Sequence, residues 1–248
     1  RIRLVVQGET TNYIYVAGNL LDSGAENYEY NLAGEVTAIG ARSITYDAEG
    51  RIATDTTPTG TVTYDYDAFG NRVRATTGGT AEWRLWDQFG NEIADADEEG
   101  NVVEFRYYVP GRMDALIGFS RGESTYFTLP DPAGNIAIVL DGNANMVARY
   151  AYEPFGMRAD DSFDSVDNRF RYAKRREERS GEVYVRARSL DVATSRFMQR
   201  DPLFIGNNSD PFSWSGYLYA NNDGVNLKDL TGLDCVPNTN VFDYSLNI

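Results

Sequence analysis

A short motif recurs with a period of 20 residues and constrains the fold of this chain more than any other feature. In each copy an aromatic residue is followed by Asp, two variable residues and Gly, with the aspartates at Asp47, Asp67 and Asp87. Asp at the first position and Gly at the fourth are typical of a type I turn, in which the Asp side chain accepts hydrogen bonds from backbone N–H groups. Strand-like runs such as residues 61–66 flank these turns, so each copy predicts a β-hairpin. A hairpin cannot bury its apolar face alone, and the hairpins are therefore expected to stack into one long sheet.

Alternation along the strands assigns a place to the aromatic residues of the repeat. Every second side chain of a strand points to the same face, so Tyr64 and Tyr66 are expected on one face and Asp65 on the other. The aromatic residues are expected to pack in the wall of the sheet, with sugar stacking as the alternative; they are Tyr64, Tyr66, Trp83 and Trp86. The repeat aspartates are expected to form turns, because a calcium site would need a denser acidic loop.

Helical signals are weak throughout the chain. The charged run at residues 174–179 lies between strand-like residues 169–172 and 182–188, so a polar hairpin loop is predicted there rather than a helix. Residues 160–167 are rich in Asp and Ser and predict a surface loop that serves as a linker. The sequence therefore predicts an all-β fold.

Composition limits the chemistry that the chain can perform. It contains no histidine and one cysteine, Cys235. Ser-His-Asp and Cys-His catalysis, an internal disulfide framework and cysteine-rich zinc sites are thereby excluded. Catalysis would have to come from carboxylates, hydroxyls, Lys or Arg, and no cofactor or metal is expected.

The net charge of −14 disfavours nucleic acid as a partner, because phosphate binding needs clustered Lys and Arg. The charge is uneven, since residues 169–200 hold 10 Arg and Lys against 4 Asp and Glu. Either acidic neighbours neutralise this stretch, or it forms a basic patch that faces a cargo or a second chain. No apolar run reaches membrane-spanning length. The chain opens at Arg1 without a leader, and we expect it to be a piece of a longer polypeptide.

The C-terminal part of the chain carries a second set of motifs. They are residues 181–188, Asp191, residues 195–200, Asp201-Pro202 and residues 229–233. Together with the repeats, this block resembles the C-terminal core-associated region of bacterial Rhs proteins, which share the YD-repeat shell with the Tc-toxin C component and the teneurins. The resemblance spans roughly residues 28–233. It implies a sheet that spirals into part of a hollow shell, with the terminal block folded inward as a plug.

Read through this resemblance, the chain has three parts. Residues 1–160 form the YD-repeat β-shell, residues 161–233 form the plug with a candidate autoprotease, and residues 234–248 are a tail or the start of a cargo. The resemblance implies that the shell encloses a toxin or another cargo made after it. The implied partners are that C-terminal segment, a shell portion preceding Arg1 and a secretion machinery, in a bacterial protein that is secreted, displayed at the cell surface or injected.

The resemblance also implies a self-cleavage site. Asp201 and Asp229 would act as an aspartate pair that cuts the chain between Leu233 and Asp234, and Arg200 would hold a carboxylate or the scissile carbonyl by charge-assisted hydrogen bonds. Two carboxylates at short range can share one proton, so that one activates water while the other protonates the leaving group. Reserve acids for this role are Asp210 and Asp223.

Two other functions remain open from the sequence. In the first, the chain is a non-catalytic structural or adhesive surface protein in which the two aspartates only brace the plug. In the second, it is a carbohydrate-binding β-repeat protein that uses exposed Tyr and Trp rings. An uncut chain would favour the first, and exposure of the rings would favour the second.

Overall fold

A computed structural model of the chain describes residues 2–6, 9–16, 19–22, 26–203 and 215–237. Its main feature is a 14-stranded antiparallel sheet in which neighbours in the sequence are neighbours in the sheet. The strands are β4 (Tyr28–Tyr30), β5 (Val36–Ile39), β6 (Arg42–Tyr46), β7 (Ile52–Thr57), β8 (Gly60–Tyr66), β9 (Arg72–Thr77), β10 (Thr80–Trp86), β11 (Glu92–Ala96), β12 (Val102–Tyr108), β13 (Leu116–Arg121), β14 (Ser124–Pro130), β15 (Ile136–Asp141), β16 (Met146–Arg149) and β17 (Phe163–Asp164). The predicted all-β fold of stacked hairpins is confirmed.

Smaller elements stand at both ends of this sheet. Strands β1 (Ile2–Val6), β2 (Glu9–Val16) and β3 (Asn19–Asp22) form a three-stranded sheet before it. After it come η1 (Tyr172–Lys174), β18 (Val183–Val185), β19 (Arg188–Asp191), β20 (Arg196–Phe197), η3 (Ala220–Asn222), β21 (Leu227–Asp229) and β22 (Cys235–Pro237). In the part of the chain that the structure describes, the only helices are these two short 3₁₀ turns, and none is long and apolar enough to cross a membrane.

The turns of the repeat have the predicted chemistry. Oδ1 of Asp67 accepts hydrogen bonds from the backbone N–H groups of Phe69 and Asn71, both at 2.9 Å, and the N–H of Gly70 bonds to the Asp67 carbonyl at 3.1 Å. Gly70 has φ +85°, a conformation that side chains disfavour. Asp47 and Asp87 accept the corresponding backbone bonds, which confirms their role as turn residues.

The aromatic side chain of each repeat forms a hydrogen bond to the strand that follows the previous turn. Tyr66 donates its hydroxyl to the carbonyl of Ile52 at 2.9 Å, and Trp86 donates its indole N–H to the carbonyl of Arg72 at 3.1 Å. Ile52 and Arg72 are the first residues of β7 and β9, so each ring reaches the strand that begins just after the preceding Asp turn. Tyr and Trp combine an apolar ring with a polar hydrogen, which explains why either serves here.

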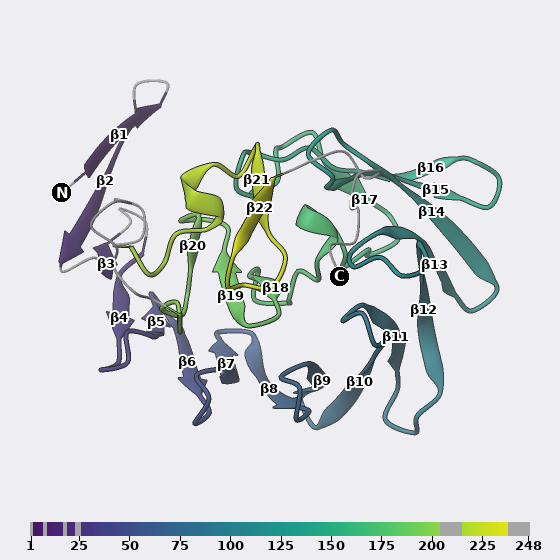
Figure 1. The fold of residues 1–248 in the computed structure, drawn as a ribbon, viewed down its shortest axis with the longest axis horizontal. Coiled ribbons are helices and arrows are strands. Elements are labelled where there is room, and N and C mark those ends of the chain that lie inside the picture. Colours follow the sequence, from purple (N-terminus) through teal and green to yellow (C-terminus); the bar gives the residue numbers. More distant parts are fainter. Residues whose placement is uncertain (1, 7–8, 17–18, 23–25, 204–214, 238–248) are drawn as a thin grey trace.

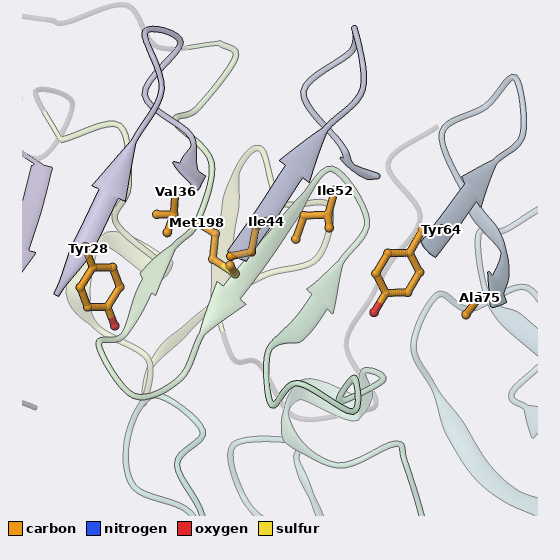
Figure 2. Close-up of a cluster of buried hydrophobic side chains, with 7 residues drawn as sticks. All are labelled: Tyr28, Val36, Ile44, Ile52, Tyr64, Ala75 and Met198. Atoms are coloured by element: carbon orange, nitrogen blue, oxygen red, sulfur yellow. The ribbon is translucent and has the colours of Figure 1, made fainter. Parts of the chain in front are cut away.

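The C-terminal segments lie on the concave side of the large sheet. Figure 1 shows the sheet running in an arc from β4 to β17, with β18–β22 inside the arc. We define the wall as the 14-stranded sheet with its connecting loops, residues 28–167, and the plug as residues 168–203 and 215–237, in place of the predicted 161–233. Met198 of the plug packs against Ile44 and Ile52 of the wall (Figure 2), and Phe170 packs against Ile136 and Val139. The predicted inward-folded segment is therefore confirmed, and it covers the apolar face that the hairpins could not bury alone.

Buried ion pairs connect the plug to the wall. Glu178 of the plug bonds to Arg72 and Arg84 of the wall, both at 2.7 Å, and Arg176 bonds to Asp95 at 2.6 Å. Buried charges are stable only when they are paired. Because of these contacts, residues 174–176 and 178 of the predicted polar hairpin loop at 174–179 are buried. As expected, acidic neighbours neutralise much of the basic stretch: Arg171, Arg175, Arg176, Arg186 and Arg188 all form ion pairs.

The predicted linker is partly a strand. Within residues 160–167, β17 pairs with β16 and extends the large sheet past position 160. Asp164 also bonds to Arg171 of the plug at 2.8 Å. This edge strand therefore belongs to the wall and contacts the plug at the same time.

Candidate functional site

Asp229 organises the loop in which the predicted cut would fall. It ends β21 and stands opposite Cys235 of β22, so that residues 230–234 close a hairpin. Oδ1 of Asp229 accepts the backbone N–H groups of Thr231, Gly232 and Leu233 at 3.1, 2.6 and 3.2 Å. Through the last of these bonds, the buried Asp229 carboxylate fixes Leu233, the residue that precedes the predicted scissile bond.

Arg188 brings the two predicted aspartates together. Its Nη2 lies 3.2 Å from Oδ2 of Asp201 and 3.4 Å from Oδ2 of Asp229, while its Nε donates to the carbonyl of Gly232. The guanidinium also covers the ring of Phe197 at 3.7 Å and is almost completely buried. Among the described residues, no hydrogen bond joins the two carboxylates directly. The predicted pair therefore meets through a shared arginine nitrogen.

Burial sets the electrostatics of this group. It raises the pKa of Asp229, although Arg188 and the three backbone N–H groups oppose the rise. Burial likewise lowers the pKa of Arg188, and the charges of Asp201 and Asp229 oppose that change. Asp229 therefore takes up a proton more readily than an ordinary Asp, which suits a general acid.

Arg200 and the reserve acids lie elsewhere or have local partners. Arg200 is exposed, and its side chain passes beside Gly34 of the wall. Asp223 accepts hydrogen bonds from the side-chain amide of Asn226 at 3.0 and 3.1 Å. Asp210 lies outside the described residues. The role of Arg200 stays a prediction, and the guanidinium between the two aspartates belongs to Arg188.

A second group holds the same loop from the wall side. Arg175 and Arg186 both donate to the carbonyl of Leu230. Asp114 of the wall accepts from Arg175 at 2.5 Å and from Arg186 at 3.1 Å. Burial raises the pKa of Asp114 to about 6, against the lowering effect of Arg186. The loop after Asp229 is thus held by three arginines of the plug, two of which are paired to the wall.

Gly232 is required by this close packing. Its φ is +79°, and a Cβ at this position would collide with the carbonyl oxygen of Val185 and lie 2.9 Å from the backbone nitrogen of Arg188. Only glycine avoids both the backbone strain and the collision. Gly232 therefore allows the loop to pack directly against the backbone of β18 at Val185 and of β19 at Arg188.

Sequence reasoning missed Arg188, Arg175, Arg186 and Asp114. A signal existed for Arg188, because it lies in a run with apolar residues on a predicted strand, and a buried arginine needs carboxylate partners. The partners could not be assigned, since Asp114 and Arg186 are 72 positions apart in the chain.

The remaining candidate sites gain no support from the geometry. Tyr64 is buried, Tyr66 and Trp86 are half-buried, and Trp83 is 38 % exposed. These four rings therefore form no exposed platform by themselves, and other exposed rings of the sheet include those of Phe105, Tyr107 and Phe127. No group of three or more His, Cys, Asp or Glu side chains that could hold a metal ion occurs within the described ranges.

The sequence matches a family model and several known proteins. The family model described as RHS Repeat matches residues 46–82. A tRNA nuclease WapA of Bacillus subtilis is 30 % identical over 141 residues, which is 56 % of this chain and 6 % of that protein. A tRNA3(Ser)-specific nuclease WapA of Bacillus spizizenii is 28 % identical over 128 residues, 50 % of this chain and 5 % of that protein. The chain thus spans about one twentieth of the length of these relatives.

The fold matches solved structures over most of the chain. A crystal structure of TcdB2-TccC3 superposes with a TM-score of 0.64 at 15 % identity, covering 90 % of this chain and 14 % of that one. A Tc holotoxin pore from Photorhabdus luminescens gives a TM-score of 0.64 at 15 % identity, covering 90 % of this chain and 13 % of that one. At this identity the likeness shows a common fold.

Proposed function

Because this chain is an Rhs/YD-repeat protein, we propose that it forms the C-terminal part of a β-shell that encloses a cargo and cuts its own chain after Leu233. The concave side of its sheet is covered by a plug, as a shell end requires. The cargo is a toxin or another polypeptide segment on the C-terminal side of the plug. Secretion, surface display or injection from a bacterium, with a further shell portion and a secretion machinery as partners, belongs to the same proposal.

The contact of Arg188 with both Asp201 and Asp229 carries the self-cleavage part of the proposal. In the reaction Asp201 accepts a proton from water, whose oxygen attacks the carbonyl carbon of Leu233. Asp229 gives its proton to the nitrogen of Asp234 as the bond breaks. Asp201 is the more exposed acid and can meet water, whereas Asp229 is buried and holds a proton more readily than usual. The products are a Leu233 carboxylate and an Asp234 amine.

Substitution of the two acids tests the proposal. The full natural polypeptide, with any residues beyond position 248, is expressed as wild type and as Asp201→Asn and Asp229→Asn. Wild type should yield a fragment that begins at Asp234 by N-terminal sequencing, and both variants should stay whole. Asp223→Asn is the matched control, because Asp223 caps a turn in the same plug through Asn226 and should leave cleavage unchanged. Cleavage by either acid variant at the wild-type rate would refute the assigned roles.

A static plug is the second candidate, and one observation favours it. Arg188 lies between the two carboxylates, and Oδ1 of Asp229 already accepts three backbone N–H groups. Such an arrangement also describes a brace that keeps the plug folded. If the wild-type chain stays whole, the protein is a non-catalytic shell in which the aspartates only stabilise the loop.

A further inference from the structure

A cavity of about 590 Å³ opens beside the loop after Asp229. It lies between wall segments near residues 88–89 and 110–115 and the plug residues 173–174, 228 and 230. Its volume falls in the range of small-molecule sites. Neither Asp201 nor Asp229 lines it, but Leu230 of the cleavage loop and Asp114, which helps to hold that loop, do.

Lys174 lines this cavity with an unpaired charge. The residue is 6 % exposed, and within the described part of the chain no hydrogen bond or ion pair reaches its ammonium group. Burial lowers the pKa of Lys174, Lys228 lowers it further, and Asp114 and Asp131 oppose the change. A buried cation without a partner destabilises a fold. Its backbone is also strained, because Lys174 has φ 56° and the preceding Ala173 has φ 50°.

Most charged side chains in the lining of the cavity are basic. Arg112 and Lys228 join Lys174 in the lining, where Asp114 is the one acid. Asp114 is already paired to Arg175 and Arg186 and makes no hydrogen bond or ion pair with Lys174.

The rest of the lining is apolar. Phe89 is 40 % exposed and Met113 is 38 % exposed, and both line the cavity together with Pro110, Ala115 and Leu230. Exposed aromatic and thioether side chains next to a buried cation suit a ligand with an apolar body and one acidic group.

We propose that this cavity is a binding site for a carboxylate carried on an apolar body, with Lys174 binding the acid and Phe89 and Met113 contacting the body. The carboxylate belongs either to a small organic acid or to an acidic side chain flanked by aromatic residues in a peptide. In both cases the ligand supplies the charge partner that Lys174 lacks.

Ligand-observed NMR titration of the full chain tests the site. The probes are 3-phenylpropionate and its neutral analogue 3-phenylpropanamide, followed by a capped Phe-Glu-Phe peptide and its Phe-Gln-Phe counterpart. The carboxylate should bind about tenfold or more tightly than its amide, because a charge-assisted bond is lost in the amide. A preference confined to the first pair assigns a small acid, and one confined to the second pair assigns a peptide. Equal binding of acid and neutral probe in both pairs, or no binding of any acid, would overturn the proposal.

Lys174→Met is the decisive variant. It should abolish the preference for the acid and, because it removes an unpaired buried charge, it should keep or raise the melting temperature. Arg149→Met is the control, since Arg149 is half-exposed and pairs with Asp161 on the surface. The site is also refuted if Lys174→Met unfolds the protein, because Lys174 would then be a structural residue.

Discussion

Nη2 of Arg188 donates a hydrogen bond to Oδ2 of Asp229 at 3.4 Å, and the same nitrogen lies 3.2 Å from Oδ2 of Asp201. The arginine comes from the first residue of β19, whereas one acid lies after β20 and the other ends β21. One buried guanidinium therefore holds three segments of the plug in a single arrangement. Stability and the proposed chemistry of the plug both depend on it.

Removal of Arg188 should destabilise the fold strongly. Arg188→Met leaves Asp201 and Asp229 without their shared counter-charge, and breaking a buried ion pair typically costs about 3–5 kcal/mol. We expect a loss of this size in the free energy of unfolding, measured by urea denaturation. The surface variant Arg149→Met should change it by less than about 1 kcal/mol. Equal effects of the two variants would contradict the importance of the bridge.

Gly232→Ala separates close packing from backbone strain. Gly232 and Gly100 both have positive φ, but a Cβ at Gly100 would meet nothing within 4 Å. Gly100→Ala should therefore cost only the strain of about 1–2 kcal/mol. Gly232→Ala adds a backbone collision and should cost about 1–3 kcal/mol more, as overpacking does. Thermal unfolding of both variants gives the comparison, and a matching loss in both would show that the loop can move away from Val185.

Glu178 should make the folded protein less stable at low pH. Burial alone would raise its pKa, but Arg84 and Arg72 lower it below the ordinary 4.5. Because the folded pKa is lower than the unfolded one, the stabilisation is fully present above pH 4.5 and is lost as the pH falls through the folded pKa. Glu178→Gln should thus cost about 3–5 kcal/mol at pH 7.

The pH dependence itself provides the check on Glu178. The difference in unfolding free energy between wild type and Glu178→Gln should shrink when the urea titration is repeated at about pH 3. Asp161→Asn, which alters an exposed pair, should show a small difference at both pH values. A difference for Glu178 that grows toward acid would mean that its contacts with the two arginines do not favour the charged form.

The hydroxyl of the repeat tyrosine should contribute to each hairpin junction. Tyr46 donates to the carbonyl of Val36 at 2.7 Å, and Tyr46→Phe removes this bond while it keeps the ring. A loss of about 1 kcal/mol in unfolding free energy is expected. Tyr107 bonds to Ser120 on an exposed surface, so Tyr107→Phe should have a smaller effect. If Tyr107→Phe lowers the unfolding free energy as much as Tyr46→Phe does, the hydroxyl at the hairpin junction contributes no more than an exposed one.

Short-range sequence patterns predict the large sheet of this protein but only part of the candidate cleavage site. The turns at Asp47, Asp67 and Asp87 form within four residues, so their Asp and Gly positions are sufficient to place them. The paired charges of the plug depend on partners far away in the sequence: Glu178 and Arg72 are 106 positions apart. A charged run without its partners resembles a solvated loop, which is why the burial of residues 174–176 and 178 could not be predicted. The meeting of Asp201 with Asp229 came from family resemblance, and the arginine between them came only from the structure.

Strand β22 determines how the proposed cut should be measured. It starts two residues after Leu233 and stays paired with β21, so the fragments should remain together after cleavage. We therefore expect the wild-type full chain to give one combined mass under native conditions and two masses under denaturing conditions, with one fragment ending at Leu233. A single uncut mass under denaturing conditions would contradict self-cleavage and leave Asp201 and Asp229 as braces of a static plug.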